Sequence, residues 1–131
     1  MFGLKKWRII IVGLFVVFIC IIYLIIFFDT NSVIDDFKAV ANGESHQIID
    51  YGELARYDGK KYFKDFSRAN VEIRRTFVMH NFNEGYMNIV YTIERFNDKG
   101  EHIYGAWNIP AKWYIKKIDG RWQVTKIEEA S

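Results

Sequence analysis

Side chains that could take part in catalysis are scattered along the sequence, and no motif brings them together. The candidates for a general base are Asp50, His80, Glu94 and His102. No phosphate-binding loop or nucleophile motif accompanies them, and the three histidines are too widely spaced for a helical zinc motif. We therefore expect no catalytic residue, no cofactor and no metal site, and the sequence favours a protein that is not an enzyme.

A few residues are weak candidates for a pocket or a protein interface. These candidates are Arg75, His80, Tyr104, Trp107 and Tyr114. Both His80 and His102 lie beside predicted turns among polar residues, so we expect them to face solvent. Most of the many aromatic side chains are expected to fill the core of a small domain, which leaves a few tyrosines for a partner.

Arg75 departs from its surroundings because it lies on the apolar side of a predicted strand, between Ile73 and Phe77. A buried charge needs a partner, so Arg75 could face a polar pocket that takes an anionic group. Alternatively, the strand shifts register there, or the side chain reaches out to solvent at the rim of the sheet. The sequence favours these two alternatives over the pocket.

The run from Ile9 to Phe28 contains 20 residues without a charge. At about 1.5 Å per residue a helix of this length spans roughly 30 Å, the thickness of the hydrocarbon core of a bilayer. A cleaved signal peptide is the alternative, but the run is longer than such segments and ends in Phe27 and Phe28 rather than in small residues. The sequence predicts an uncleaved membrane anchor, with Trp7 at the opposite boundary.

The charges on either side of this run predict its orientation. Lys5, Lys6 and Arg8 precede it, whereas all 16 Asp and Glu follow it. The positive-inside rule predicts a cytoplasmic stub at 1–8, a transmembrane helix at 9–28 and an extracytoplasmic domain at 29–131 in the cell membrane.

The exported domain carries a net charge of −1, so we expect no nucleic acid among its partners. The only cysteine is Cys20, which leaves this domain without a disulfide bond and suggests a bacterial envelope.

Apolar periodicity predicts helices in the first part of this domain. The residues at 33–41 repeat with helical spacing, with Ser32 as the expected N-cap and Gly43 as the stop. One or two short helices are expected within 44–66, interrupted at Gly52 and at Asp58-Gly59.

From Asn70 onward the apolar residues alternate, which predicts four antiparallel strands. In the first strand Phe77 and Met79 are expected to share the apolar face with Val71 and Ile73. Turns are expected at 83–85, 98–100 and 119–120. Pro110 requires an edge position, a bulge or a break in the third strand.

Helices followed by an antiparallel meander predict an α+β domain in which a curved sheet of about four strands packs around the helices. This order, and the closing run from Trp113 to Val124 with its Asp119-Gly120 turn, resembles the NTF2-like, cystatin-like cone fold. The plan of one N-terminal helix before such a cone is similar to VirB8-like envelope proteins. The resemblance covers about residues 31 to 128, and this fold carries many unrelated functions.

The sequence thus favours a membrane-tethered protein-binding module, a subunit or adaptor of a bacterial cell-envelope, secretion or conjugation assembly. Its expected partners are the lipid bilayer and other membrane or envelope proteins, with homo-oligomers as a further possibility. The alternatives are a surface immunity or exclusion protein directed against a toxin or phage component, and a tethered ligand-binding or enzymatic cone domain with a polar pocket.

Overall fold

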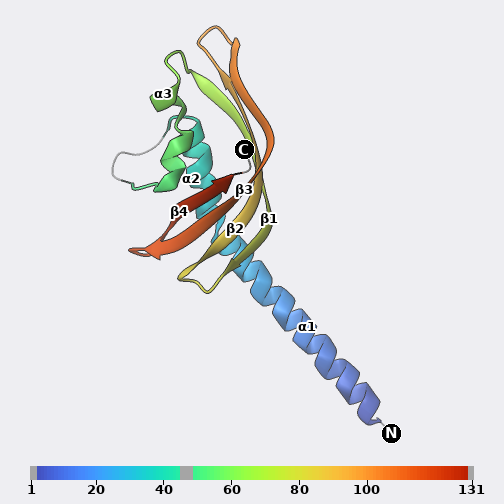
Figure 1. Cartoon of the computed structure of the whole chain (residues 1–131). Helices are drawn as coiled ribbons and strands as arrows, with labels where there is room; N and C mark the ends of the chain where they lie inside the picture. The colour runs from blue at the N-terminus through green and yellow to red at the C-terminus, as the bar shows by residue number, and fades with distance from the viewer. Residues whose placement is uncertain (1–2, 45–48, 130–131) are drawn as a thin grey trace.

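The computed structural model describes residues 3–44 and 49–129. It has the α+β architecture expected from the sequence, with one long N-terminal helix and a curved, four-stranded antiparallel sheet in the order β1-β2-β3-β4 (Figure 1). The elements in chain order are α1 (Leu4–Asp29), α2 (Asn31–Ala41), the 3-10 helix η1 (Glu53–Tyr57), α3 (Gly59–Tyr62), β1 (Arg68–His80), β2 (Glu84–Phe96), β3 (His102–Ile118) and β4 (Arg121–Glu129).

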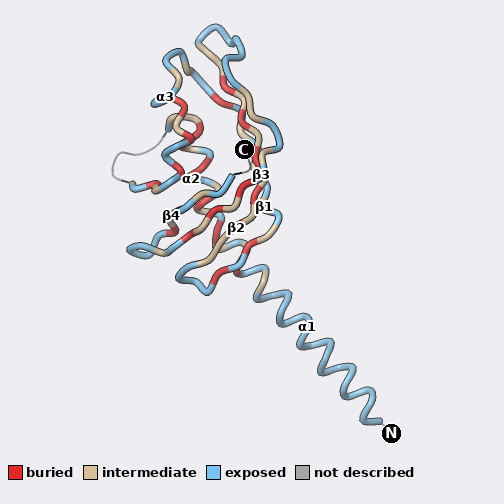
Figure 2. Tube along the Cα trace, in the orientation of Figure 1, coloured by how far each residue is buried: buried red, intermediate tan, exposed pale blue. Residues whose placement is uncertain are grey.

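Helix α1 leaves the rest of the molecule and is exposed over almost its entire length (Figure 2). It has 26 residues, and only Ile26 in its last turn is buried. The run at 9–28 of α1 is apolar on every side, so its exposure to water is unfavourable. The helix is long and apolar enough to cross a membrane. This character is compatible with a membrane anchor or with a signal sequence.

Helix α2 follows α1 after a single residue, Thr30, and packs against the sheet. Its apolar stripe of Val33, Phe37 and Val40 is buried, as the helical spacing predicted. The predicted N-cap was wrong: Ser32 lies inside α2, and the Thr30 hydroxyl donates back to the Phe27 carbonyl instead. The expected stop is confirmed, because the chain turns after Ala41 and Gly43 has a φ of 69°.

The face of the sheet toward α2 and η1, called the inner face here, is filled by packed aromatic rings. The Phe37 ring centroid lies 5.1 Å from those of both Tyr57 and Trp113, and Tyr57 lies 5.3 Å from Tyr91. Trp113 and Phe37 are completely buried. The large side chains that the sequence placed in a core therefore occupy the concavity of the sheet.

A register shift in β1 changes which residues face inward. The pairing with β2 slips between Arg75 and Phe77, so one extra residue is accommodated there. Because side chains alternate along a strand, this shift turns Val78 and His80 to the inner face and leaves Met79 41% exposed. The prediction that Met79 shares a face with Ile73 was wrong for this reason.

Two of the three predicted turns are placed correctly. Asp119 and Gly120 both have positive φ, 53° and 77°, as a two-residue type I′ hairpin requires. Between β2 and β3 the chain turns at 97–101, as predicted. Between β1 and β2 it reverses at Asn81–Asn83, because Glu84 and Gly85 already belong to β2.

The two edges of the sheet differ in how far they are covered. At the β1 edge, the Ala69 N–H donates to Asn42 Oδ1 at 3.0 Å and the Val78 N–H to the Tyr23 hydroxyl at 3.4 Å. Strand β4 pairs with β3 only from Ala111 onward, so no described strand pairs with the outer edge of β3 at 102–110. Pro110 lies at the end of this free edge, in agreement with the sequence-based expectation.

Candidate functional site

The most extensive polar arrangement in the described residues joins the end of α1 to three strands of the sheet. We call this arrangement the helix–sheet junction. Its members are Ile26, Phe27, Asp29, Thr30, Arg75, His80, Lys117 and Trp122.

The junction caps the carbonyl end of α1. His80 Nε2 lies 2.8 Å from the Ile26 carbonyl oxygen, while His80 Nδ1 accepts the Phe82 N–H at 2.9 Å. The ring therefore carries its proton on Nε2 and donates to the carbonyl. Arg75 Nη1 donates to the Phe27 carbonyl at 2.9 Å and to the Thr30 hydroxyl at 3.0 Å. A cation at this position also complements the negative end of the helix dipole.

Asp29, the last residue of α1, is contacted by side chains of β3 and β4. The Trp122 indole N–H of β4 donates to Asp29 Oδ2 at 2.9 Å, and Lys117 Nζ of β3 lies 3.5 Å from the same oxygen. Trp122 is buried and its ring packs 4.7 Å from that of His80. The end of α1 is thus fixed to β1, β3 and β4 at once.

Two of the predicted candidate residues, Arg75 and His80, belong to the junction. Arg75 is half-buried on the end of α1, and the register shift expected beside it is confirmed. The expectation that His80 faces solvent was wrong, because the same shift turns it inward and leaves it 5% exposed. Sequence reasoning missed the roles of Asp29, Thr30 and Trp122; the only signal was a carboxylate directly after a long apolar run.

The other candidates are dispersed. Tyr104 packs on the inner face, 5.0 Å from the Phe63 ring and 5.3 Å from the Arg95 guanidinium carbon. Trp107 lies on the outer face of β3, where its indole N–H donates to Glu94 Oε1 of β2 at 2.8 Å. The Trp107 ring covers Gly105, where a Cβ would come within 2.2 Å of it.

Tyr114 lies on the outer face among charged side chains. Lys112 Nζ is 5.0 Å and Lys126 Nζ 5.3 Å from the centre of its ring. Its hydroxyl donates to Glu128 Oε1 at 3.4 Å. This is a solvated surface arrangement and has no contact with the junction.

The predicted membrane flanks occupy the two ends of α1. Lys5, Lys6, Trp7 and Arg8 lie within its exposed first two turns. At the other end, the Phe27 ring lies 4.1 Å from the Arg75 guanidinium carbon and belongs to the junction, whereas Phe28 is 56% exposed.

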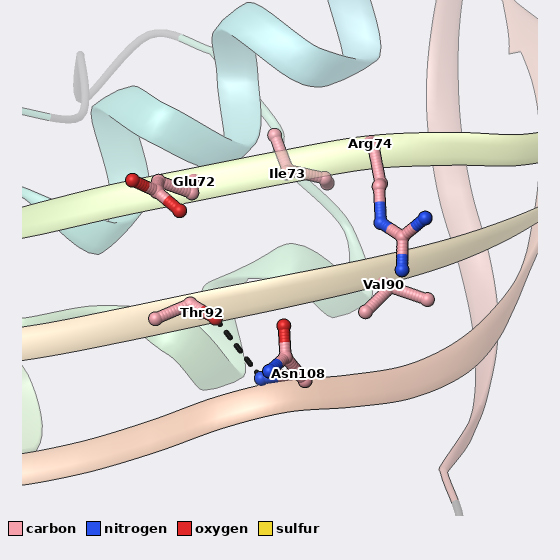
Figure 3. A pocket seen from close by; sticks show the side chains of 6 residues that line it. All are labelled: Glu72, Ile73, Arg74, Val90, Thr92 and Asn108. Carbon is pink, nitrogen blue, oxygen red and sulfur yellow. Dashed lines mark hydrogen bonds between the residues drawn. The ribbon is translucent and has the colours of Figure 1, made fainter.

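A shallow depression of about 240 Å³ lies on the outer face above the middle of β1 and β2 (Figure 3). Glu72, Arg74 and Asn108 are among its lining residues, and the Asn108 N–H donates to Thr92 Oγ1 at 2.9 Å. Its charged groups belong to exposed residues of β1, so the depression offers no enclosed site for a ligand.

A second polar cluster closes the inner face beside the aromatic core. The hydroxyls of Tyr57 and Tyr91 both donate to Glu129 Oε1, at 2.5 and 2.6 Å. The Trp113 indole N–H nearby has no hydrogen-bond partner among the described residues. Burial, reinforced by the hydrogen bond to Glu129, raises the pKa of both tyrosines far above the ordinary value, so both remain neutral donors.

Comparisons with protein-family models, curated proteins and solved structures found no match to this chain. The resemblance to NTF2-like domains and to the VirB8-like plan stays a prediction.

We predict that Thr30→Val weakens the junction, because it removes the hydroxyl that links Arg75 to Phe27. The free energy of unfolding should fall by about 1–2 kcal/mol, measured by urea denaturation of the full-length protein in detergent. Thr125→Val is the matched control, since the Thr125 hydroxyl is exposed, and it should change the free energy by less than about 0.5 kcal/mol. Combined with Arg75→Met, the Thr30→Val effect should be non-additive by about 0.5–1 kcal/mol. Additive losses would show that Arg75 and Thr30 are not coupled.

The tyrosine cluster predicts a loss of stability at alkaline pH. A group whose folded pKa is raised contributes stability that is present below its unfolded pKa, about 10 for tyrosine, and is lost as the pH rises above it. Tyr91→Phe should therefore make this decline less steep by about 1.4 kcal/mol per pH unit above pH 10. Urea denaturation at pH 9, 10.5 and 11 measures this slope, and equal slopes in variant and wild type would contradict the account.

Proposed function

We propose that this chain is a single-pass membrane protein whose C-terminal domain binds another protein outside the cytoplasm. In this proposal it serves as a subunit or adaptor of a bacterial cell-envelope or secretion assembly. The exposed, uncharged run at 9–28 of α1 supports the anchor, and the cations at the N-terminal end of the helix support a cytoplasmic N-terminus.

The helix–sheet junction supports a positioning role for the anchor. Hydrogen bonds from His80, Arg75 and Trp122 hold the end of α1 directly against the sheet. A domain fixed to its membrane helix keeps one height and orientation, and tethering raises its effective concentration for partners in the same membrane. These properties suit a component of an assembly better than a freely diffusing binder.

The observation that carries the protein-binding proposal is the free edge of β3 at 102–110. The backbone groups of this segment that point away from β2 have no strand partner among the described residues, and an exposed edge is a template for a strand from another protein. Trp107, 53% exposed, and Ile103, 37% exposed, lie along this segment. Both side chains could anchor a partner beside the added strand.

The filled inner face favours a protein partner over a small ligand. Phe37, Tyr57 and Trp113 occupy the concavity in which a ligand-binding or enzymatic cone would need a pocket. A toxin or phage component, as an immunity or exclusion protein would require, could also bind the free edge of β3.

Site-specific photocrosslinking tests this proposal. A photoreactive phenylalanine analogue replaces Ile103 in the tagged full-length protein, and the cells are irradiated before detergent extraction and mass spectrometry. Replacement of Tyr62, which is 57% exposed in α3, is the matched control. We expect one defined adduct with an envelope protein from position 103, lost in Trp107→Ala and absent from position 62. The absence of an adduct, or the same adducts from both positions, would contradict the proposal.

A further inference from the structure

We infer that the β1–β2 turn is a second membrane contact, with the ring of Phe82 in the lipid headgroup region beside α1. This inference rests on the membrane anchoring proposed above. It identifies the partner of this surface as the bilayer and makes the domain lie on the membrane rather than stand away from it.

Two successive contacts, through His80, bring Phe82 close to the last turn of α1. His80 binds the Ile26 carbonyl, and the Phe82 ring centroid lies 4.9 Å from that of His80. Ile26 lies within the apolar run Ile9–Phe28, whose length of roughly 30 Å matches the hydrocarbon core. The β1–β2 turn also lies beside the point where α1 enters the domain (Figure 1).

The β1–β2 turn exposes the Phe82 side chain although this requires an unfavourable, positive φ at Phe82. Phe82 has a φ of 67°, a region that bulky side chains rarely adopt, and it is nonetheless 44% exposed. Asn81 Oδ1 accepts the N–H groups of Asn83 at 3.0 Å and Glu84 at 2.9 Å, and the Asn83 carbonyl accepts the Lys117 N–H at 2.7 Å. The turn is therefore well defined, and an aromatic ring displayed in this way suits the membrane–water interface.

The opposite end of α1 opposes any displacement that would lift Phe82 out of the interface. Raising the domain would draw Lys5, Lys6 and Arg8 toward the bilayer interior, where charged side chains are unfavourable. Phe28, 56% exposed in the last turn of α1, also remains at this level. The N-terminal cations and Phe28 thus favour the same depth of the domain in the membrane as the contact of the β1–β2 turn does.

Spin-label accessibility in vesicles tests this inference. The full-length protein is reconstituted into phosphatidylethanolamine–phosphatidylglycerol vesicles and labelled at one cysteine per sample. The samples are Asn83→Cys and Asp98→Cys, both in a Cys20→Ser background, and the native Cys20 in the wild-type sequence. Asp98 lies in the β2–β3 turn, so it is the matched turn control. The ratio of collision rates with oxygen and with a water-soluble nickel complex reports exposure to lipid.

We expect this ratio to be several-fold higher at Asn83 than at Asp98, and highest at Cys20. Phe82→Gly, which tolerates the positive φ, should preserve the circular dichroism spectrum and lower the ratio at Asn83 to that of Asp98. If Cys20 is lipid-exposed and Asn83 matches Asp98, the turn contact is wrong and the anchor remains. Protection of Asn83 from both agents would mean a protein contact and would also overturn the inference. Water exposure at Cys20 would overturn the proposed anchoring itself.

Discussion

The carbonyl groups at the end of α1 are the constraint on which the arrangement of this molecule depends. A helix leaves its last carbonyl groups without partners inside the helix, so other donors must satisfy them. The Phe27 carbonyl accepts the Thr30 N–H and hydroxyl, and Arg75 of β1 adds a third donor to it. His80 of β1 donates to the Ile26 carbonyl, and Trp122 of β4 holds the carboxylate of Asp29. The sheet thereby fixes the direction in which the apolar helix leaves the domain.

The register shift in β1 is what allows this cap. Without the extra residue between Arg75 and Phe77, the alternation of the strand would turn His80 to the outer face, away from Ile26. The shift also turns Met79 outward. One local irregularity therefore connects strand pairing, helix capping and the character of the surface beside the end of α1, as is common for bulges that redirect functional side chains.

The sequence predicted the elements well because their signals are local. The apolar run of α1, the stripe of α2, the four alternating strands and the Asp119-Gly120 turn each depend on neighbouring residues. The junction could not be predicted, because its partners are separated by more than 40 residues and meet only after the sheet has formed. His80 was misplaced because alternation alone does not reveal where a strand gains a residue.

Rigidity at the junction is the central claim, because both the positioning role and the depth of the β1–β2 turn require it. Pulsed electron paramagnetic resonance can test it with spin labels at Val12→Cys in α1 and Lys99→Cys in the β2–β3 turn, in a Cys20→Ser background. Both native side chains are exposed, so the labels should not disturb the fold. A single narrow distance distribution in lipid nanodiscs is predicted. A broad distribution, of the width expected for a flexible linker at Thr30, would contradict the account.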